Sequence, residues 1–125
     1  MPYTTDYDQE ADIIRVVVSG ELDLPLLQNM AKSVAKTMQE TGCKRVLNDL
    51  RNATAAQLAL DIYNMPAVAR DSGIQAQIRR ALVVGDKTSE FYFLETMFIN
   101  RGHIVKIFAN VRAAITWLTR GEDAS

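Results

Sequence analysis

The sequence predicts a single α/β domain with a mixed, mostly parallel five-stranded sheet and helices mainly on one face. Strand-like and helix-like segments alternate four times in 125 residues, which is the pattern of a parallel sheet. A polar, extended segment at residues 3–10 precedes these units and is expected to form an N-terminal β-hairpin with the first strand. Polar residues interrupt three apolar strands, at Arg15, Asn48 and Lys106. Because strands buried on both faces are continuously apolar, one sheet face should be less covered than the other.

Four runs of β-branched and apolar residues, each bounded by turn-forming residues, predict the strands that follow the polar segment. The first run is nearly all β-branched, as expected of a buried strand. The four predicted strands are Ile13–Ser19, Arg45–Leu50, Arg79–Gly85 and Ile104–Ala109.

The clearest helix signal follows the first of these strands. Apolar residues recur at helical spacing from Leu26 to Met38, and polar residues occupy the opposite face. Asp23 and Pro25 suit the start of a helix, and Gly42 suits its C-terminal end. The sequence therefore predicts an amphipathic helix between the first two long strands.

Three further helices are predicted between and after the remaining strands. The segment 55–72 has a helical composition but contains Pro66, which removes a donor and clashes with the preceding turn. It is therefore either two short helices or one kinked helix. A third helix is expected over about residues 86–101, and a last one over 111–118, with Asn110 as its cap.

The composition is that of an ordinary globular protein and argues against several functional classes. The 14 basic residues are interspersed among 15 acidic ones, so we expect no nucleic-acid partner. No apolar run approaches the roughly 20 residues of a membrane span. The N-terminal segment lacks the features of a signal peptide and Cys43 is alone, so we expect a cytoplasmic protein. The domain is expected to span residues 1–125, with its core at about 3–119 and a polar tail at 120–125.

Motifs that would indicate an enzyme are scarce. The segment Gly85–Thr88 is similar to a phosphate-binding loop but lacks the adjacent Gly-Lys pair and the earlier glycine of that motif. One cysteine and one histidine, Cys43 and His103, stand far apart, so we expect no metal site. We interpret Cys43 as a structural thiol and His103 as a surface residue at a helix end. No base and nucleophile converge, so we expect neither enzymatic activity nor a cofactor.

The predicted third helix carries an unusual concentration of large apolar side chains. One interpretation is a wide core face with one tolerated exposed aromatic residue. The other is a homodimer surface, or a pocket for a small apolar ligand between helices, which Tyr63 and Met65 would also line. The residues of this helix that both interpretations concern are Phe91, Tyr92, Phe93 and Met97.

The order of elements resembles the STAS domain, the fold of bacterial anti-sigma-factor antagonists, over about residues 3–119. Gly20–Asp23 is similar to the family's G-x-L-D motif, and Val46–Asn52 is similar to V-x-L-D-L-x-x. Phe108–Leu118 matches F-x-[DN]-x-x-x-A-x-x-W-L and looks like the SpoIIAA-like branch of small uncharacterised proteins. This branch is often grouped with the CRAL-TRIO lipid-carrier fold. The resemblance implies a SpoIIAA-like arrangement of helices and strands.

The sequence departs from the family at its regulatory site. STAS antagonists carry a phosphorylatable serine in a D-S-S-G-L stretch that leads into the second helix. The matching segment, Asn52–Leu60, lacks both the serine and the glycine, and Thr54 is the only hydroxyl nearby. Thr54 is therefore either the N-cap of the second helix or, in principle, a phosphate acceptor.

Two functions remain open from the sequence. The first is a non-enzymatic regulatory or protein-interaction module of STAS type. Its binding surface would include Asn52, Thr54 and Gln57, with Asp49 positioning the loop. The alternative is a carrier or sensor of a small apolar ligand, bound in a pocket between helices. The sequence identifies neither the protein partner nor the ligand, and a homodimer is compatible with both functions.

Overall fold

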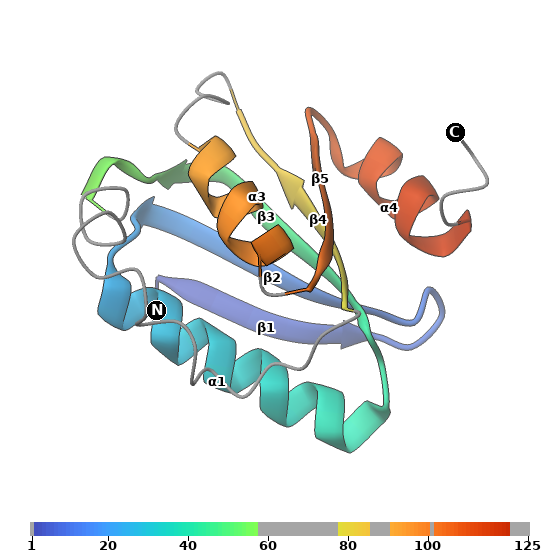
Figure 1. The fold of residues 1–125 in the computed structure, drawn as a ribbon. Coiled ribbons are helices and arrows are strands. Elements are labelled where there is room, and N and C mark those ends of the chain that lie inside the picture. The colour runs from blue at the N-terminus through green and yellow to red at the C-terminus, as the bar shows by residue number, and fades with distance from the viewer. Residues whose placement is uncertain (1, 58–77, 86–90, 101, 121–125) are drawn as a thin grey trace.

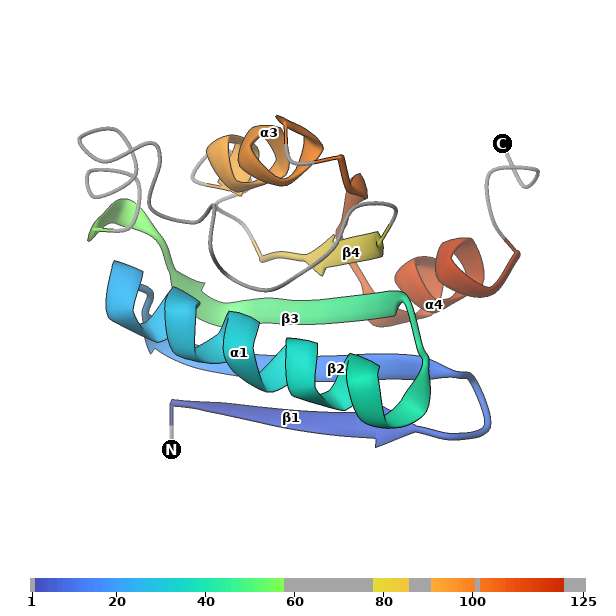
Figure 2. The ribbon, with the colours of Figure 1, turned by 60° about the horizontal axis from the view of Figure 1, so that its bottom comes forward.

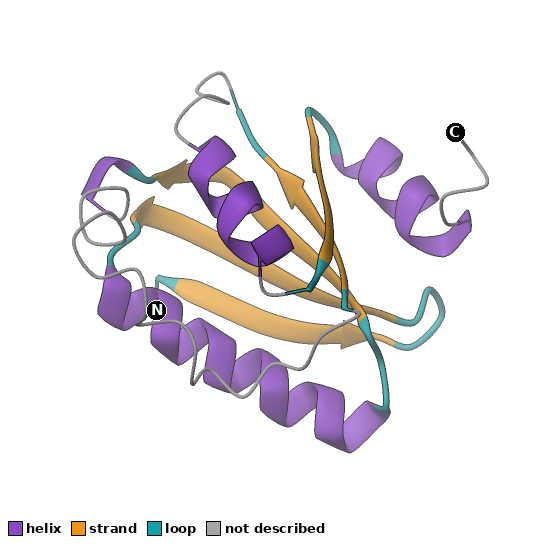
Figure 3. Cartoon of the chain, viewed as in Figure 1, coloured by secondary structure: helices purple, strands orange, loops and turns teal. Residues whose placement is uncertain are grey.

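The computed structural model describes residues 2–57, 78–85, 91–100 and 102–120, which form a five-stranded sheet with helices packed on it (Figures 1 and 3). The strands are β1 (Tyr3–Asp8), β2 (Ile13–Glu21), β3 (Arg45–Thr54), β4 (Arg79–Val83) and β5 (Ile104–Phe108). The helices are α1 (Leu24–Thr41), α3 (Tyr92–Asn100) and α4 (Val111–Arg120). Across the sheet the strands lie in chain order, from β1 to β5.

The sheet is mixed, as predicted. Strands β1 and β2 form an antiparallel hairpin, and the three other neighbouring pairs are parallel. Right-handed crossovers that step in one direction across a sheet place their helices on the same face. Helices α1 and α3 accordingly share one face, and α1 runs along β1 and β2 (Figure 2). Helix α4 follows the last strand and packs on the opposite face. Among the described helices, the predicted preference for one face is confirmed.

Two separate hydrophobic cores reflect these two faces. The larger core lies between the sheet and helices α1 and α3, and it includes Ile14, Val16, Met30, Val34, Leu82, Leu94 and Phe98. The smaller core lies under α4 and includes Ile13, Leu47, Ala81, Val83, Trp117 and Leu118. Successive strand residues contribute to opposite cores because their side chains alternate across the sheet. Leu47 and Ala81, for example, sit under α4, between neighbours that face α1 and α3.

The ends of α1 follow the expected capping chemistry. The backbone N–H of Leu26 donates a 2.9 Å hydrogen bond to Oδ1 of Asp23, and Pro25 occupies the first turn. At the other end Gly42 adopts φ 75°, a left-handed conformation that suits glycine, and its N–H donates to the Met38 carbonyl. Helix α4 begins in a similar way, because Asn110 accepts a 2.8 Å hydrogen bond from the Ala113 N–H.

Side-chain alternation corrects one expectation about the sheet. Arg15 lies on the same side of β2 as Ile13, and Lys106 lies near Phe108, so both belong to the face that carries α4. Asn48 lies on the opposite face, beneath α1 and α3, and is only 5% exposed. The expectation that Asn48 marks the less covered face is therefore wrong. Its side chain belongs to the more covered face, where it borders a pocket.

The boundaries of several elements differ from the prediction. Strands β2 and β3 continue to Glu21 and Thr54, because a register shift after Val17 lets their last residues pair again. Most of the predicted helical region 55–72, including Pro66, lies outside the described residues, as do residues 86–90 and 121–125.

Candidate functional site

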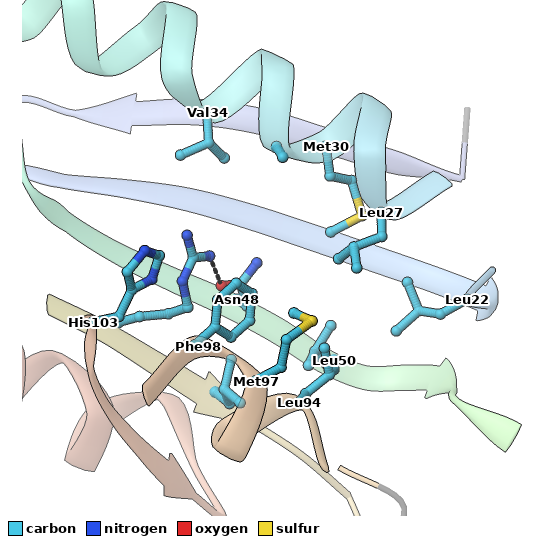
Figure 4. A pocket seen from close by; sticks show the side chains of 13 residues that line it. Leu22, Leu27, Met30, Val34, Asn48, Leu50, Leu94, Met97, Phe98 and His103 are labelled. Atoms are coloured by element: carbon cyan, nitrogen blue, oxygen red, sulfur yellow. Dashed lines mark hydrogen bonds between the residues drawn. The ribbon is translucent and has the colours of Figure 1, made fainter. Parts of the chain in front are cut away.

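A pocket of about 40 Å³ lies between α1, α3 and the sheet (Figure 4). This volume corresponds to roughly three water-sized positions. Apart from one amide, one guanidinium and one imidazole, the described lining residues are apolar, a composition typical of small-molecule sites. They are Leu22, Leu27, Met30, Ala31, Val34, Asn48, Leu50, Arg80, Leu82, Leu94, Met97, Phe98 and His103.

The register of β3 and β4 brings Asn48 and Arg80 together. Arg80 pairs with Val46, and Asn48 pairs with Leu82. Leu82 is the next residue of β4 after Arg80 that faces the pocket. The two polar side chains therefore lie diagonally across neighbouring parallel strands. Nη1 of Arg80 donates a 2.6 Å hydrogen bond to Oδ1 of Asn48. At 2% and 5% exposure, these side chains place a buried positive charge and an amide at one end of the pocket.

Aromatic contacts hold this polar end in place. The Arg80 guanidinium lies 4.2 Å from the centre of the Phe98 ring, a cation–π distance. His103 stacks on Phe98 with ring centres 5.3 Å apart and planes inclined by 14°. The His103 side chain is 4% exposed, so the interpretation of this residue as a surface histidine is wrong. The turn after α3 folds His103 inward, where it packs beside Phe98 at the pocket.

The opposite end of the pocket is apolar. Figure 4 shows His103, Asn48 and Phe98 near one end, and Leu22, Leu50 and Leu94 toward the other. Met30 and Met97 project into the space from facing helices, α1 and α3. Methionine is unbranched and flexible, so these two side chains can adapt to an occupant. The pocket is thus polarised along its length and adaptable in its middle.

A second candidate region lies where β2 and β3 end side by side. Ser19 pairs with Asn52, and Glu21 pairs with Thr54. The Leu22 N–H donates to the Thr54 carbonyl at 2.8 Å, which fixes the chain where the strands separate. We call the exposed side chains here, those of Ser19, Glu21, Asn52 and Gln57, the strand-end surface. This edge carries the carboxyl ends of parallel strands, where ligands of α/β proteins commonly bind.

A carboxylate lies at the start of the helical segment that follows this edge. The backbone N–H of Gln57 donates to Oε2 of Glu21 at 3.4 Å. Thr54 is half-buried at the end of β3, just before this segment. A negative charge is electrostatically favourable beside the first N–H groups of a helix. Glu21, which pairs with Thr54 across the two strands, therefore places a carboxylate next to it.

Asp49, predicted to position the loop after β3, is buried on the α4 side of the sheet. Its two carboxylate oxygens accept hydrogen bonds of 2.9 and 2.7 Å from Nε and Nη2 of Arg51. These hydrogen bonds lower the pKa of the Asp49 carboxyl below its ordinary value of 3.8. Asp49 thus orients Arg51, while its own side chain lies beneath the surface.

The aromatic side chains of the α3 region point in different directions. Phe91 is buried in the larger core, and Phe93 packs partly buried against it. Tyr92 is 55% exposed, and Met97 lines the pocket. Of the sequence-predicted pocket residues, the structure thus brings Met97 to this pocket and leaves the three aromatic residues away from its lining. Tyr63 and Met65 lie outside the described residues.

Cys43 is a buried thiol, as expected. It is 2% exposed, and its Sγ lies 3.2 Å from the Asp12 carbonyl oxygen. Burial raises the pKa of the Cys43 thiol, which keeps it protonated. In the described part of the chain, no three His, Cys, Asp or Glu side chains are grouped as metal ligands would be. No helix there is long and apolar enough to cross a membrane.

Three solved structures share this arrangement of strands and helices. An anti-sigma factor antagonist from Mycobacterium paratuberculosis aligns with a TM-score of 0.61 and 16% identity, covering 93% of each chain. The chain has the SpoIIAA-like fold. An uncharacterised protein of that fold from Shewanella loihica aligns at 0.58 and 14% identity, covering 93% of this chain and 91% of its own. The anti-sigma factor antagonist SpoIIAA, in its unphosphorylated form, aligns at 0.54 and 11% identity, covering 95% and 98%.

The resemblance to the STAS domain is therefore confirmed at the level of the fold. No family model matches the sequence, and no curated protein matches it significantly. Identities of 11–16% show that the SpoIIAA-like fold is shared and leave the function to be argued from the site itself.

Sequence reasoning missed the polar end of the pocket. Asn48 is visible in the sequence as a polar residue within an apolar strand, and Arg80 stands at the edge of another. These two signals point to a buried polar pair only when β3 and β4 are known to be neighbours in this register. His103 gave no such signal, because its burial depends on the turn that connects α3 to β5.

Proposed function

We propose that this SpoIIAA-like protein is a non-enzymatic regulatory module of STAS type that binds a protein partner through the strand-end surface. The observation that carries the proposal is the cluster of exposed polar side chains where β2 and β3 end together, beside a helical segment whose Gln57 N–H faces Glu21. Two structurally similar proteins are anti-sigma factor antagonists, which act on another protein. Their fold supports a comparable role for this chain.

The regulation we propose does not depend on a phosphorylated side chain at the second helix. Thr54 is the only hydroxyl in the segment that matches the family's regulatory serine, and it is half-buried. Glu21 already supplies a negative charge there, so a phosphate on Thr54 would be repelled by a like charge. We therefore expect the module to bind its partner constitutively, and we place it in the cytoplasm, where a lone free cysteine persists.

Site-specific crosslinking tests this proposal. A photoreactive benzoyl-phenylalanine is introduced at Asn52 or Gln57 and, as a control, at the exposed Arg112 of α4. We expect the first two positions, but not the third, to crosslink to the same protein in cells that naturally make this chain. With that partner purified, Asn52→Arg should weaken binding at least about tenfold. Crosslinks of equal yield from all three positions, or from none, would contradict the proposal.

A matched substitution tests the regulatory part separately. Thr54→Val keeps the shape of the side chain and removes the hydroxyl. We expect this variant to bind the partner with the affinity of the wild type. We also expect that affinity to be the same before and after treatment of the protein with a phosphatase. If Thr54→Val weakens binding of the partner in cells, and the Thr54→Ser control does not, the hydroxyl is needed and this part of the proposal is wrong.

The pocket favours a second candidate function, a carrier or sensor of a small ligand. The observation in its favour is the polarised, mostly apolar space between α1 and α3. Native mass spectrometry of freshly purified protein tests it. A small molecule bound to the folded protein and released on denaturation supports this function. A ligand-free protein, with no binding of any probe compound in solution, contradicts it.

A further inference from the structure

The two outer strands of the sheet have open edges. Strands β1 and β5 bound the sheet, and β1 forms its lower limit in Figure 2. Neither outer strand contains a buried residue, whereas each of the three inner strands does. An open edge presents backbone N–H and C=O groups that can pair with a further strand.

At the β5 edge, every second residue directs its backbone groups outward. The Ile104 N–H and the Phe108 carbonyl form hydrogen bonds of 2.9 and 3.0 Å with residues at the two ends of β4. Successive residues of a strand direct their backbone groups to opposite sides. Val105 and Ile107 therefore direct theirs away from β4, to the open edge.

The β1 edge has the same alternation. The Ser19 N–H donates a 2.9 Å hydrogen bond to the Pro2 carbonyl, so this pair of residues is a hydrogen-bonded one. Hydrogen-bonded and non-hydrogen-bonded pairs alternate along an antiparallel ladder. In the register of β1 and β2, the backbone groups of Tyr3, Thr5 and Tyr7 consequently point to the open edge.

The two edges carry opposite charges on one face of the sheet. Tyr7 packs against the larger core, so Asp6 and Asp8 lie on the other face, the face that carries α4. Lys106 of β5 lies on that face too, and all three charged residues are exposed. The ion pairs of the described residues involve neither Lys106 nor Asp6, and Arg15, which is opposite Asp6 in the register, forms none with it.

We propose that copies of this protein associate head to tail, with β5 of one copy paired antiparallel to β1 of the next. Within one chain, β1 runs antiparallel to its neighbour and the other four strands are parallel. A second copy in the same orientation, placed beside β5, therefore brings its β1 antiparallel to β5. The inference concerns the sheet edges and is independent of the partner-binding function above.

The backbone and the side chains agree on the register of this pairing. Val105 pairs with Tyr7 of the neighbouring copy, and Ile107 pairs with its Thr5, so that the outward-directed backbone groups of both edges meet. The side chains of Val105, Ile107 and Tyr7 pack against the larger core, and Thr5 forms a hydrogen bond with Ser33 of α1. All four side chains thus belong to the same sheet face, as residues that pair directly must.

This register places Lys106 opposite Asp6 of the neighbouring copy. The two residues form a non-hydrogen-bonded pair, the kind in which opposite side chains lie closest. Asp8 of the neighbouring copy is the diagonal neighbour of Lys106. Two β5 edges paired about Lys106 would oppose two ammonium groups, and like charges directly opposite are destabilising. The charges therefore favour the mixed pairing of β5 with β1.

The contact is heterologous, so each added copy leaves one β1 edge and one β5 edge open. Sedimentation velocity of the full chain over about a hundredfold range of concentration tests for such growth. We expect the weight-average sedimentation coefficient to rise with concentration and not to level off at the dimer. High salt should weaken the association, because it screens exposed charges.

Charge reversal identifies the two edges. Lys106→Glu and Asp6→Lys should each weaken self-association at least about tenfold, because each puts like charges opposite one another. An equimolar mixture of the two variants should associate again, since every β5 edge then meets a β1 edge of opposite charge. Lys36→Glu and Glu40→Lys, on the exposed surface of α1, make the same changes in net charge and should associate like the wild type.

Amide hydrogen exchange reports the strand pairing directly. The amides of Val105 and Ile107 should exchange at least about tenfold more slowly at high protein concentration than at low concentration. The Lys106 amide, which points to β4, is the internal control and should change little. NMR resolves these neighbouring amides and also verifies that each variant is folded.

The outcomes decide between this contact and the alternatives. A protein that stays monomeric at every concentration overturns the proposal. Self-association that survives Asp6→Lys shows that β1 is not the partner of β5 and overturns it as well, as does an equal loss in the α1 controls. Association that is lost in both edge variants and recovered in their mixture, with protection of Val105 and Ile107, supports it.

Discussion

The guanidinium of Arg80 donates a 2.6 Å hydrogen bond to Asn48 across two neighbouring parallel strands, and both side chains are buried. Parallel pairing of β3 and β4 places them diagonally, on the sheet face that α1 and α3 cover. A hydrogen-bond acceptor stabilises a buried guanidinium and an apolar neighbour does not, because an unsatisfied charged donor is costly in a medium of low dielectric. We therefore expect this contact to contribute to stability.

We predict that Asn48→Leu destabilises the fold. The substitution removes one acceptor, the Asn48 Oδ1, from a buried guanidinium, which should lower the free energy of unfolding by about 1–3 kcal/mol. Asn48→Asp retains an acceptor and should be less destabilising than Asn48→Leu. Urea denaturation, monitored through Trp117 fluorescence, measures both. If Asn48→Leu is as stable as the wild type, the hydrogen bond does not contribute to folding.

Asp49 should make stability depend on pH in the acid range. Its pKa in the folded protein lies below the ordinary value of 3.8, because Arg51 holds the charged form. The stabilisation is therefore present above about pH 4 and is lost as the pH falls through the folded pKa. Asp49→Asn should destabilise the protein by about 1 kcal/mol at pH 7, and by less near pH 3. Chemical denaturation at the two pH values tests this. An equal loss at both would show that ionisation of Asp49 is not involved.

Cys43 should react slowly with thiol reagents in the folded protein. The thiol is 2% exposed, and burial raises its pKa, so little thiolate forms at neutral pH. We expect labelling by a disulfide-exchange reagent to be at least about a hundredfold faster in denaturant, where the thiol is exposed. Rapid labelling of the folded protein would contradict this burial.

The raised pKa of the Cys43 thiol also links stability to pH in the alkaline range. Because the folded pKa lies above the unfolded one, the contribution of this group to stability persists below the unfolded value. It is lost as the pH rises through the folded pKa.

We predict that any two-fold symmetric homodimer of this protein forms through the exposed face of α3. Tyr92 and Ile99 lie two helical turns apart on this face, at 55% and 50% exposure. If two copies associate here, Tyr92→Glu should give a folded monomer, because burying a carboxylate in an apolar interface is costly. Gln39→Glu, on the exposed surface of α1, is the control and should not change the mass. Light scattering after gel filtration gives the mass of each. A Tyr92→Glu variant that remains dimeric rules out this face.

The helix cap at Asp23 offers a test of local stability. Its carboxylate accepts the Leu26 N–H at 2.9 Å, so Asp23→Ala leaves one helix donor without this acceptor. We expect a loss of about 1 kcal/mol in the free energy of unfolding. Asp23→Ser supplies another capping oxygen and should restore most of the loss. The urea midpoints of the three proteins decide this, and equal midpoints would mean that the cap is not needed.

Local sequence signals were sufficient for much of the fold because they act between close neighbours. The spacing of apolar residues from Leu26 to Met38, with Asp23 before them and Gly42 after them, defines α1 through interactions within a few residues. The β-branched run before it defines β2 in the same way. The end of β3 was harder to predict, because Arg51–Thr54 is extended only by pairing with the end of β2.

The candidate pocket was beyond sequence reasoning because its parts come from distant segments. Met97 lies in the lining of the pocket between α1 and α3, whereas Phe91 belongs to the larger core and Tyr92 faces outward. Helical periodicity alone does not decide which side of a helix meets the sheet when nearly every side is apolar. The angle at which α3 packs decides it.

The sequence by itself determined the alternation of strands and helices, the hairpin, the ends of α1 and the likeness to the STAS domain. The alternation, the hairpin and the helix ends follow from periodicity and capping, which are short-range properties of the chain, whereas the likeness to the STAS domain rests on its motifs. Only the tertiary structure decided that Asn48, Arg80 and His103 meet in one pocket. The reason is that strand register and helix packing join residues that are far apart in sequence, and a polar residue within a strand shows its role only when its neighbours across the sheet are known.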